Sequence, residues 1–174
     1  MASKPTYVDD GASEIYMAST QAGVATSTAL STTQTGITLT NPSGSGKTLV
    51  LLQFRGAFTS APAAAASLVL AANVNPVATA VTQTTPLVVR KANLGVSGTG
   101  VGLAASAVTL PAAPVVVRAL GGPVATGSVS QPQVVDDIDG AICVAPGCAV
   151  SVNSLTTAIS GIWSIVWKEV AEFA

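Results

Sequence analysis

The C-terminal stretch 161–170 reads Gly-Ile-Trp-Ser-Ile-Val-Trp-Lys-Glu-Val. Successive side chains of an extended strand point to opposite faces of a sheet, so Trp163, Ile165 and Trp167 share one face. Two indole rings on that face would dominate a core built otherwise from valine and alanine. The β-branched and aromatic residues of this stretch favour a strand. We therefore expect it to be the central, closing strand of an all-β fold.

Similar strand patterns recur along the whole chain. Short runs rich in Val, Ile, Thr and aromatic residues alternate with Gly, Pro, Asn and Ser, and no sustained helical period is present. The expected strands are 36–40, 48–54, 67–72, 87–91, 107–110, 115–119, 140–144, 149–153 and 162–170. About nine short strands separated by turns are typical of an antiparallel β-sandwich or a barrel.

The segment 41–48 reads Asn-Pro-Ser-Gly-Ser-Gly-Lys-Thr and ends like a phosphate-binding loop. Such a loop needs a glycine where this chain has Asn41, and it must open a helix whose N-terminus meets the phosphate. Residues 49–54 instead continue as Leu-Val-Leu-Leu-Gln-Phe, which is a strand pattern. The segment is interpreted as a glycine-rich turn between two strands.

Composition points to one domain with an uncharged surface. The chain has 174 residues, enough for one sandwich with a real core. Charged residues make up only 9% of it, against about a quarter in ordinary globular domains. A free monomer of this kind would be poorly protected against association, so we expect an oligomer or a lattice. Residues 1–35 are assigned to an extended N-terminal arm and residues 36–174 to the sandwich.

Several classes of function are disfavoured by the same composition. The seven Lys and Arg residues are scattered, with one adjacent pair at Arg90 and Lys91, so no basic footprint for nucleic acid is present. The longest apolar stretch, 101–117, is broken by two prolines and does not resemble a membrane span. No apolar signal-like run follows the N-terminus, which favours synthesis in the cytoplasm.

Catalysis and metal binding also find little support. The chain has no histidine, which removes the commonest general base and every Ser-His or Cys-His pair. Asp136, Asp137 and Asp139 form an acidic cluster that is interpreted as a solvated loop, because the further ligands of a calcium loop are missing. Cys143 and Cys148 flank a four-residue loop and are either free buried thiols or, if the loop is a hairpin, close enough for a disulfide. No catalytic residue, cofactor or metal ligand is assigned.

The N-terminal arm is a candidate docking element. The arm contains the candidate docking residues Tyr7, Asp9, Asp10, Ile15 and Tyr16, because an extended segment can add to a neighbour's exposed sheet edge and its acidic groups could pair with cations on a partner. A solvated tail is the alternative. Residues 60–67 form either one helical turn or a loop, and residues 120–132 are expected to be a long loop.

Three stretches carry a resemblance to a known class of proteins. They are residues 41–51, residues 144–152 (Val-Ala-Pro-Gly-Cys-Ala-Val-Ser-Val) and residues 164–170 (Ser-Ile-Val-Trp-Lys-Glu-Val). Together they resemble the small jelly-roll decoration or cement proteins of tailed bacteriophages, over about residues 36–170. The resemblance implies a jelly-roll-like sandwich of two Greek-key sheets that forms a homo-trimer, or a dimer, on the capsid exterior after assembly in the host cytoplasm.

The function that follows from this resemblance is structural. Such proteins bridge neighbouring major capsid subunits and reinforce the shell, and they have no catalytic residues. One alternative is a tail or head-fibre module that recognises a host-surface glycan, although few aromatic residues are available to stack on sugars. A second alternative, a nucleotide hydrolase using Lys47 and Thr48, would require a helix after Thr48.

Overall fold

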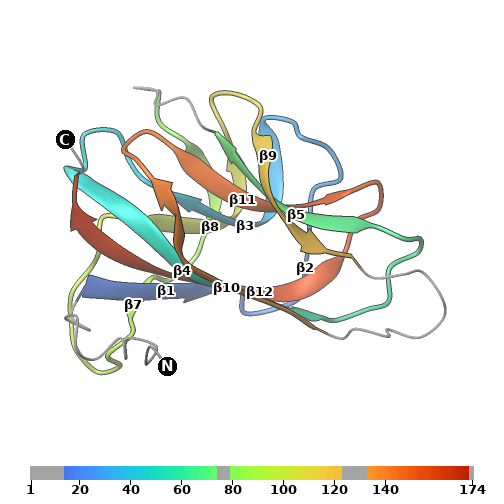
Figure 1. The fold of residues 1–174 in the computed structure, drawn as a ribbon, viewed down its shortest axis with the longest axis horizontal. Coiled ribbons are helices and arrows are strands. Elements are labelled where there is room, and N and C mark those ends of the chain that lie inside the picture. The colour runs from blue at the N-terminus through green and yellow to red at the C-terminus, as the bar shows by residue number, and fades with distance from the viewer. Residues whose placement is uncertain (1–13, 74–78, 123–132, 173–174) are drawn as a thin grey trace.

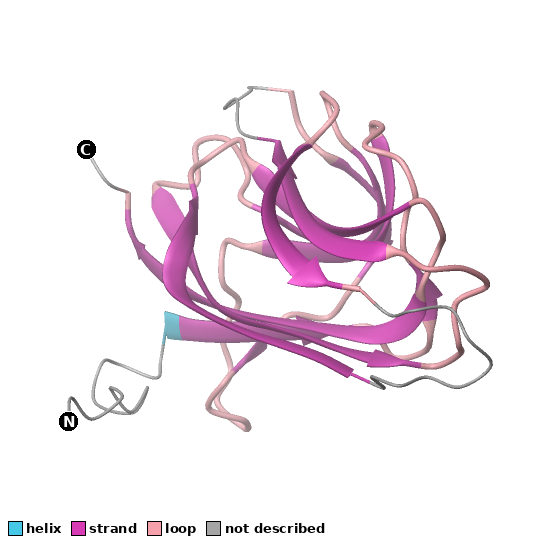
Figure 2. Ribbon diagram, turned by 45° about the vertical axis from the view of Figure 1, so that its right-hand side comes forward, coloured by secondary structure: helices cyan, strands magenta, loops and turns pink. Residues whose placement is uncertain are grey.

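The computed structural model describes residues 14–73, 79–122 and 133–172, and it is all-β (Figures 1 and 2). No α-helix occurs in these ranges. The strands are β1 (Ile15–Ser19), β2 (Val24–Ala25), β3 (Thr33–Thr40), β4 (Lys47–Phe58), β5 (Ser67–Asn73), β6 (Thr82–Pro86), β7 (Arg90–Lys91), β8 (Leu103–Thr109), β9 (Val115–Gly121), β10 (Gln133–Val144), β11 (Ala149–Leu155) and β12 (Ser160–Ala171).

These strands form two six-stranded sheets that pack face to face as a jelly-roll-like sandwich. The first sheet has the order β10-β4-β12-β1-β7, with β2 also paired to β12. The second sheet has the order β6-β8-β3-β11-β5-β9. All strand pairs in both sheets are antiparallel. Figure 2 shows the two curved layers facing each other, and this architecture confirms the all-β sandwich expected from the sequence.

Strand β12 lies in the middle of the first sheet, as its pattern predicts. It pairs with β4 on one side and with β1 on the other. Trp163 and Trp167 are fully buried and Ile165 is nearly so, which confirms that the three side chains face the core. Trp163 stacks on Phe54 of β4 with ring centroids 6.0 Å apart, and Trp167 stacks on Tyr16 of β1 at 6.1 Å.

The second sheet supplies the opposing half of the core. Buried aliphatic side chains from its three central strands meet the tryptophan face of the first sheet, and they are Ile37 and Leu39 on β3, Leu68 and Leu70 on β5, and Val150 and Val152 on β11. Apolar burial of this kind contributes roughly 25 cal/mol per Å² removed from water, so the seam between the sheets is the main source of stability.

The boundary expected between arm and sandwich is wrong for the described residues. Residues 15–19 form β1, which pairs with β12 from Ile15 opposite Lys168 to Ser19 opposite Ser164. Ile15 and Tyr16, expected as docking residues of the arm, are buried at 3% and 7% exposure within the sandwich. They therefore stabilise this fold and are not available to a partner.

Three local expectations differ from the structure. Of the strand expected at 87–91, only Arg90 and Lys91 form a strand, the short edge strand β7, and residues 87–89 lie outside any strand. β10 begins at Gln133 rather than at residue 140, so Asp136, Asp137 and Asp139 lie within a strand and not in a loop. The long loop expected at 120–132 begins later, because β9 continues to Gly121, and residues 123–132 lie outside the described part. Residues 60–67 contain no helical turn, which agrees with the loop alternative.

Candidate interaction surfaces

The glycine-rich turn after β3 is held by the side chain of Asn41, which is fully buried. Its Nδ2 donates to the carbonyl oxygens of Lys47 at 2.7 Å and Val144 at 2.8 Å, and its Oδ1 accepts from the Ser45 hydroxyl at 2.6 Å. Thr48 then continues into β4, a strand of twelve residues. The turn is thus a structural joint, and the helix that a phosphate-binding loop requires is absent from this described segment.

The same asparagine also fastens the connection between β10 and β11. Its backbone N–H donates to the carbonyl of Cys148 at 3.0 Å, and its carbonyl accepts from Gly147 N–H at 2.9 Å. β10 belongs to the first sheet and β11 to the second, so this connection is a corner between sheets and not a hairpin. The sequence alone indicates only a turn residue at Asn41. Val144, whose carbonyl accepts from the Asn41 side chain, is 103 residues away in the chain.

Cys143 and Cys148 stand at this corner as free thiols. The expectation that both thiols are buried is wrong for Cys143, which is exposed. Cys148 is buried in the core, and burial raises the pKa of its thiol. A low thiolate fraction and poor access both slow alkylation. Neither thiol has the features of a nucleophile or a metal ligand.

We expect a maleimide to label Cys143 in the native protein at least about a hundredfold faster than Cys148, because labelling Cys148 requires opening of the core. Mass spectrometry after timed quenching measures both rates. The Cys143→Ser variant should then show no fast phase. Two equally fast thiols in the native protein would contradict the buried position of Cys148.

A buried carboxylate at Glu169 was not anticipated from the sequence. Glu169 follows Trp167 by two residues, so it shares the inward face of β12, and it is only 4% exposed. Its oxygens accept from the backbone N–H of Val101 at 3.0 Å, the backbone N–H of Gly102 at 2.9 Å and the indole Nε1 of Trp167 at 3.2 Å. Three donors satisfy the buried charge, which fastens the segment before β8 onto the first sheet.

Tyr16 lies beside this carboxylate across the sheet. Burial raises the pKa of the Tyr16 hydroxyl, and the negative charges of Glu169 and Glu14 raise it further. All three causes favour the neutral phenol. Tyr16 and Glu169 are both buried and form part of the structural network. They are not an acid–base pair at a site open to a substrate.

Two members of the acidic cluster on β10 are hydrogen-bonded to side chains of neighbouring strands. Asp136 accepts two hydrogen bonds from Arg118 on β9, at 2.5 and 2.8 Å, and this pairing raises the pKa of the guanidinium. Asp137 accepts from Gln53 Nε2 on β4 at 2.6 Å. Asp139 has a positive φ of 50° at the irregularity in the β10–β4 pairing. No group of three or more metal-ligating side chains occurs in the described residues.

The Arg118–Asp136 pair joins the two open edges of the sandwich. Among the described residues, β9 is the last strand of the second sheet and is paired with β5, and β10 is the last strand of the first sheet and is paired with β4. Val115, Val116 and Val117 on β9 are 50%, 43% and 41% exposed. Because the only charged side chain of β9 is neutralised by Asp136, this edge presents apolar side chains next to an unpaired strand backbone.

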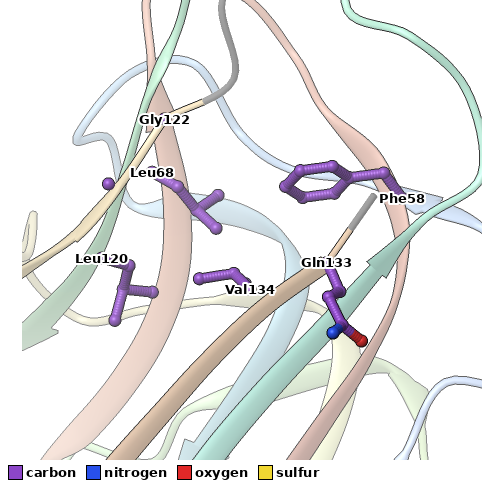
Figure 3. Close-up of a pocket in the computed structure, with 7 residues that line it drawn as sticks. Phe58, Leu68, Leu120, Gly122, Gln133 and Val134 are labelled. Atoms are coloured by element: carbon purple, nitrogen blue, oxygen red, sulfur yellow. The ribbon is translucent and has the colours of Figure 1, made fainter. Parts of the chain in front are cut away.

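A small hollow lies between the same two edges (Figure 3). It is lined by Phe58, Leu68, Leu120, Gly121, Gly122, Gln133 and Val134. Figure 3 shows the apolar side chains of Leu68, Leu120 and Val134 converging on it. Its volume of about 10 Å³ is at the lower limit for one water molecule. It is therefore a packing defect and not a ligand pocket.

A larger cleft opens at the opposite edge of the first sheet, beside β7. It has a volume of about 220 Å³ and is lined by Arg90, Lys91, Asn93, Leu94, Gly95, Val96 and Ser97. Leu94 is 72% exposed, the highest value among the large apolar residues that the structure describes. Sequence reasoning noted the pair of cations at this edge but not the apolar residues that the following loop brings beside them.

The expected docking residues are not brought together. Tyr7, Asp9 and Asp10 lie outside the described residues, while Ile15 and Tyr16 are part of the core. No helix in the described part of the chain has the length and apolar character needed to cross a membrane. Comparison with protein families, with curated proteins and with solved structures finds no match to this chain.

Proposed function

We propose that this protein is a structural virion subunit that decorates and cements the capsid of a tailed bacteriophage by bridging neighbouring major capsid subunits. The open edge formed by β9 is the observation that carries the proposal. The resemblance of three sequence stretches to jelly-roll decoration proteins adds to it, and the jelly-roll-like sandwich is the fold that this resemblance implies.

The β9 edge has the properties of a strand-addition surface. An edge strand offers unpaired N–H and C=O groups, and natural proteins usually guard such edges with lysine, proline or a covering loop. Residues 115–117 of β9 are three exposed valines with no lysine or proline among them. A strand from a second copy or from a capsid subunit would gain main-chain hydrogen bonds and apolar contact there.

Several identical contacts in one oligomer would together attach it stably to the capsid, even if each single contact is weak. A symmetric oligomer that binds several capsid subunits at once makes each later contact intramolecular, so overall binding exceeds that of any single contact. The alternative of glycan recognition has less support, because Trp163 and Trp167 are fully buried and cannot stack on a sugar.

The decisive experiment measures the mass of the full chain by light scattering, alone and with expanded tailed-phage capsids assembled without a decoration protein. We expect a stable trimer or dimer that saturates the capsids at a fixed stoichiometry and raises the temperature at which they break open. A monomer that leaves the capsids unchanged would refute the proposal.

A variant pair locates the contact on the molecule. Val115→Lys combined with Val117→Lys places two charges on the β9 edge and should weaken capsid binding or self-association at least about tenfold, because the charges would lose water in the contact. Ile162→Lys is the matched control, since Ile162 is similarly exposed at 39% but lies on the central strand β12. Equal weakening by both variants would exclude β9 as the contact.

A further inference from the structure

The strands at the ends of the two sheets differ in how well they could pair with another chain. Within the described residues these strands are β10 and β7 in the first sheet, and β6 and β9 in the second. β10 contains the three aspartates of the acidic cluster, β6 ends in Pro86, which has no N–H to donate, and β7 is only two residues long. β9 has seven residues and contains neither a proline nor a carboxylate. Of the four strands, β9 is therefore the best suited to pair with an added strand.

The first half of β9 exposes apolar side chains on both faces of the sheet. Val115, Val116 and Val117 are each at least 41% exposed, and successive side chains of a strand point to opposite faces. A strand added beside β9 would therefore contact valine side chains on both faces, in addition to forming main-chain hydrogen bonds. This contact favours an apolar strand as the partner.

The only charged residue of β9 has its counter-ion within the same chain. Arg118 is opposite Leu70 of β5, and Leu70 is buried in the core. Asp136 is opposite Phe54 of β4, which is buried as well. Because residues directly opposite each other share one face of a sheet, both charged side chains lie on the inner faces, where Arg118 donates two hydrogen bonds to the carboxylate. A partner of β9 needs no carboxylate, so a neutral strand suits it electrostatically.

Two irregularities of β9 are compatible with a second neighbour. The pairing between β5 and β9 passes over Val117 and Leu120, which have no opposite residue on β5. Such bulges increase the local twist of a strand. β4 shows that an irregular strand can still be paired on both sides, because its pairings with β10 and with β12 each contain a register shift. β9 can therefore accept a short strand on the side away from β5.

From these features we propose that β9 pairs in antiparallel orientation with β9 of a second copy of this chain, around a twofold axis that joins the two second sheets into one. A twofold contact uses the same surface on both partners, so a neutral apolar strand meets an identical one. The contact removes exposed valines from water in the free protein. This inference rests on the β9 edge of the proposed function and assigns that edge to the contact between copies in the symmetric oligomer.

Disulfide trapping of the full chain in solution tests the pairing directly. Residues opposite each other in an antiparallel pair have Cα atoms about 4.5–5.5 Å apart, which is within the range that a disulfide requires. The exposed native thiol is first removed by Cys143→Ser. Cysteine then replaces one residue of β9 at a time, in the variants Val115→Cys, Val116→Cys, Val117→Cys and Ala119→Cys.

The residues nearest the twofold axis should form a covalent dimer at least about tenfold faster than a control position under copper–phenanthroline oxidation. Thr84→Cys is the matched control, because Thr84 is exposed on β6 at the other end of the same sheet. Trapping at β9 that is no faster than trapping at Thr84 would overturn the inference.

The ion pair between β9 and β10 provides a second test. Asp136→Asn leaves the charge of Arg118 without its counter-ion, and the dimer should weaken at least about tenfold because this charge would lose water in the contact. Adding Arg118→Gln to the same chain removes the charge and should restore the dimer, which a misfolded β10 could not do. A dimer that is equally strong with and without Asp136 would contradict the electrostatic part of the inference.

The mass of the native chain separates this inference from the capsid proposal. Light scattering should find a dimer, and Val115→Lys with Val117→Lys should convert it to a monomer, whereas Ile162→Lys should leave it a dimer. A trimer that saturates the capsids would retain the capsid proposal and overturn pairing around a twofold axis. A dimer linked through β9 that leaves the capsids unchanged would support the pairing and refute the capsid proposal.

Discussion

Replacing Trp163 by alanine is expected to lower the free energy of unfolding by about 3–5 kcal/mol, the usual cost of deleting a buried tryptophan. The indole is fully buried and contacts Phe54 and Phe58, at centroid distances of 6.0 and 6.1 Å. Its Nε1 also donates to the carbonyl of Val24 at 2.8 Å, which fixes β2 beside β12. The variant therefore loses apolar contact and a hydrogen bond, and it leaves a cavity between the sheets.

The cavity will not close easily, because the neighbouring backbone is shaped around the ring. A Cβ on Gly56 would lie 2.4 Å from Cζ3 of Trp163, so β4 approaches the indole directly without a side chain between them. Urea unfolding followed by circular dichroism measures the loss. Ile162→Ala is the matched control, since this neighbour points outward at 39% exposure and should cost less than about 1 kcal/mol. Similar costs for the two variants would show that Trp163 does not anchor the core.

The sequence was sufficient to predict this core because its signal is local. Alternation of large apolar residues on β12, with the turn residues that bound β3 and β4, predicts a buried antiparallel sheet without knowledge of any partner. The expected strand boundaries at 36–40, 48–54 and 149–153 fall inside β3, β4 and β11 for the same reason.

Elements that depend on distant partners were missed. β1 lies in a stretch rich in serine, threonine and alanine, and it is a strand because β12 and β7 pair with it from both sides. The first half of β10 contains Asp136 and Asp137, which locally favour a loop. Arg118, 18 residues earlier, pairs with Asp136, and one face of an edge strand can remain solvated. Strand preference depends on such neighbours more than on the residue itself.

The buried polar joints could not have been predicted from one sequence. Glu169 accepts hydrogen bonds from residues 67 and 68 positions away, and Asn41 donates to a carbonyl 103 positions away. Nothing in the residue type distinguishes them from solvated polar residues. The β7 cleft is similar, because the adjacent cations are visible in the sequence whereas the exposed loop beside them is defined only by the fold.

Asn41→Asp is expected to cost about 3 kcal/mol or more, because a buried carboxylate would replace a donor that satisfies two carbonyl groups. In the native protein Nδ2 lies 2.7 and 2.8 Å from the oxygens of Lys47 and Val144. A carboxylate oxygen at that position has no proton to donate at neutral pH and would repel both carbonyls. Asn93→Asp, on an exposed loop, is the matched control and should stay within about 0.5 kcal/mol of the native protein.

This variant also tests whether Asn41 holds the corner between the two sheets. The corner contains Gly147 and Cys148, whose backbone groups bond to the backbone of Asn41. Loosening that joint should expose the Cys148 thiol, so maleimide labelling of Cys148 should accelerate by at least about tenfold relative to the native protein, while labelling of Cys143 stays the same. Loss of stability without faster labelling would instead mean that Asn41 supports only the glycine-rich turn. At this corner the chain passes from β10 in the first sheet to β11 in the second. A change in Cys148 labelling would therefore show that one buried amide couples the edge strand β10 to the central strands of the second sheet.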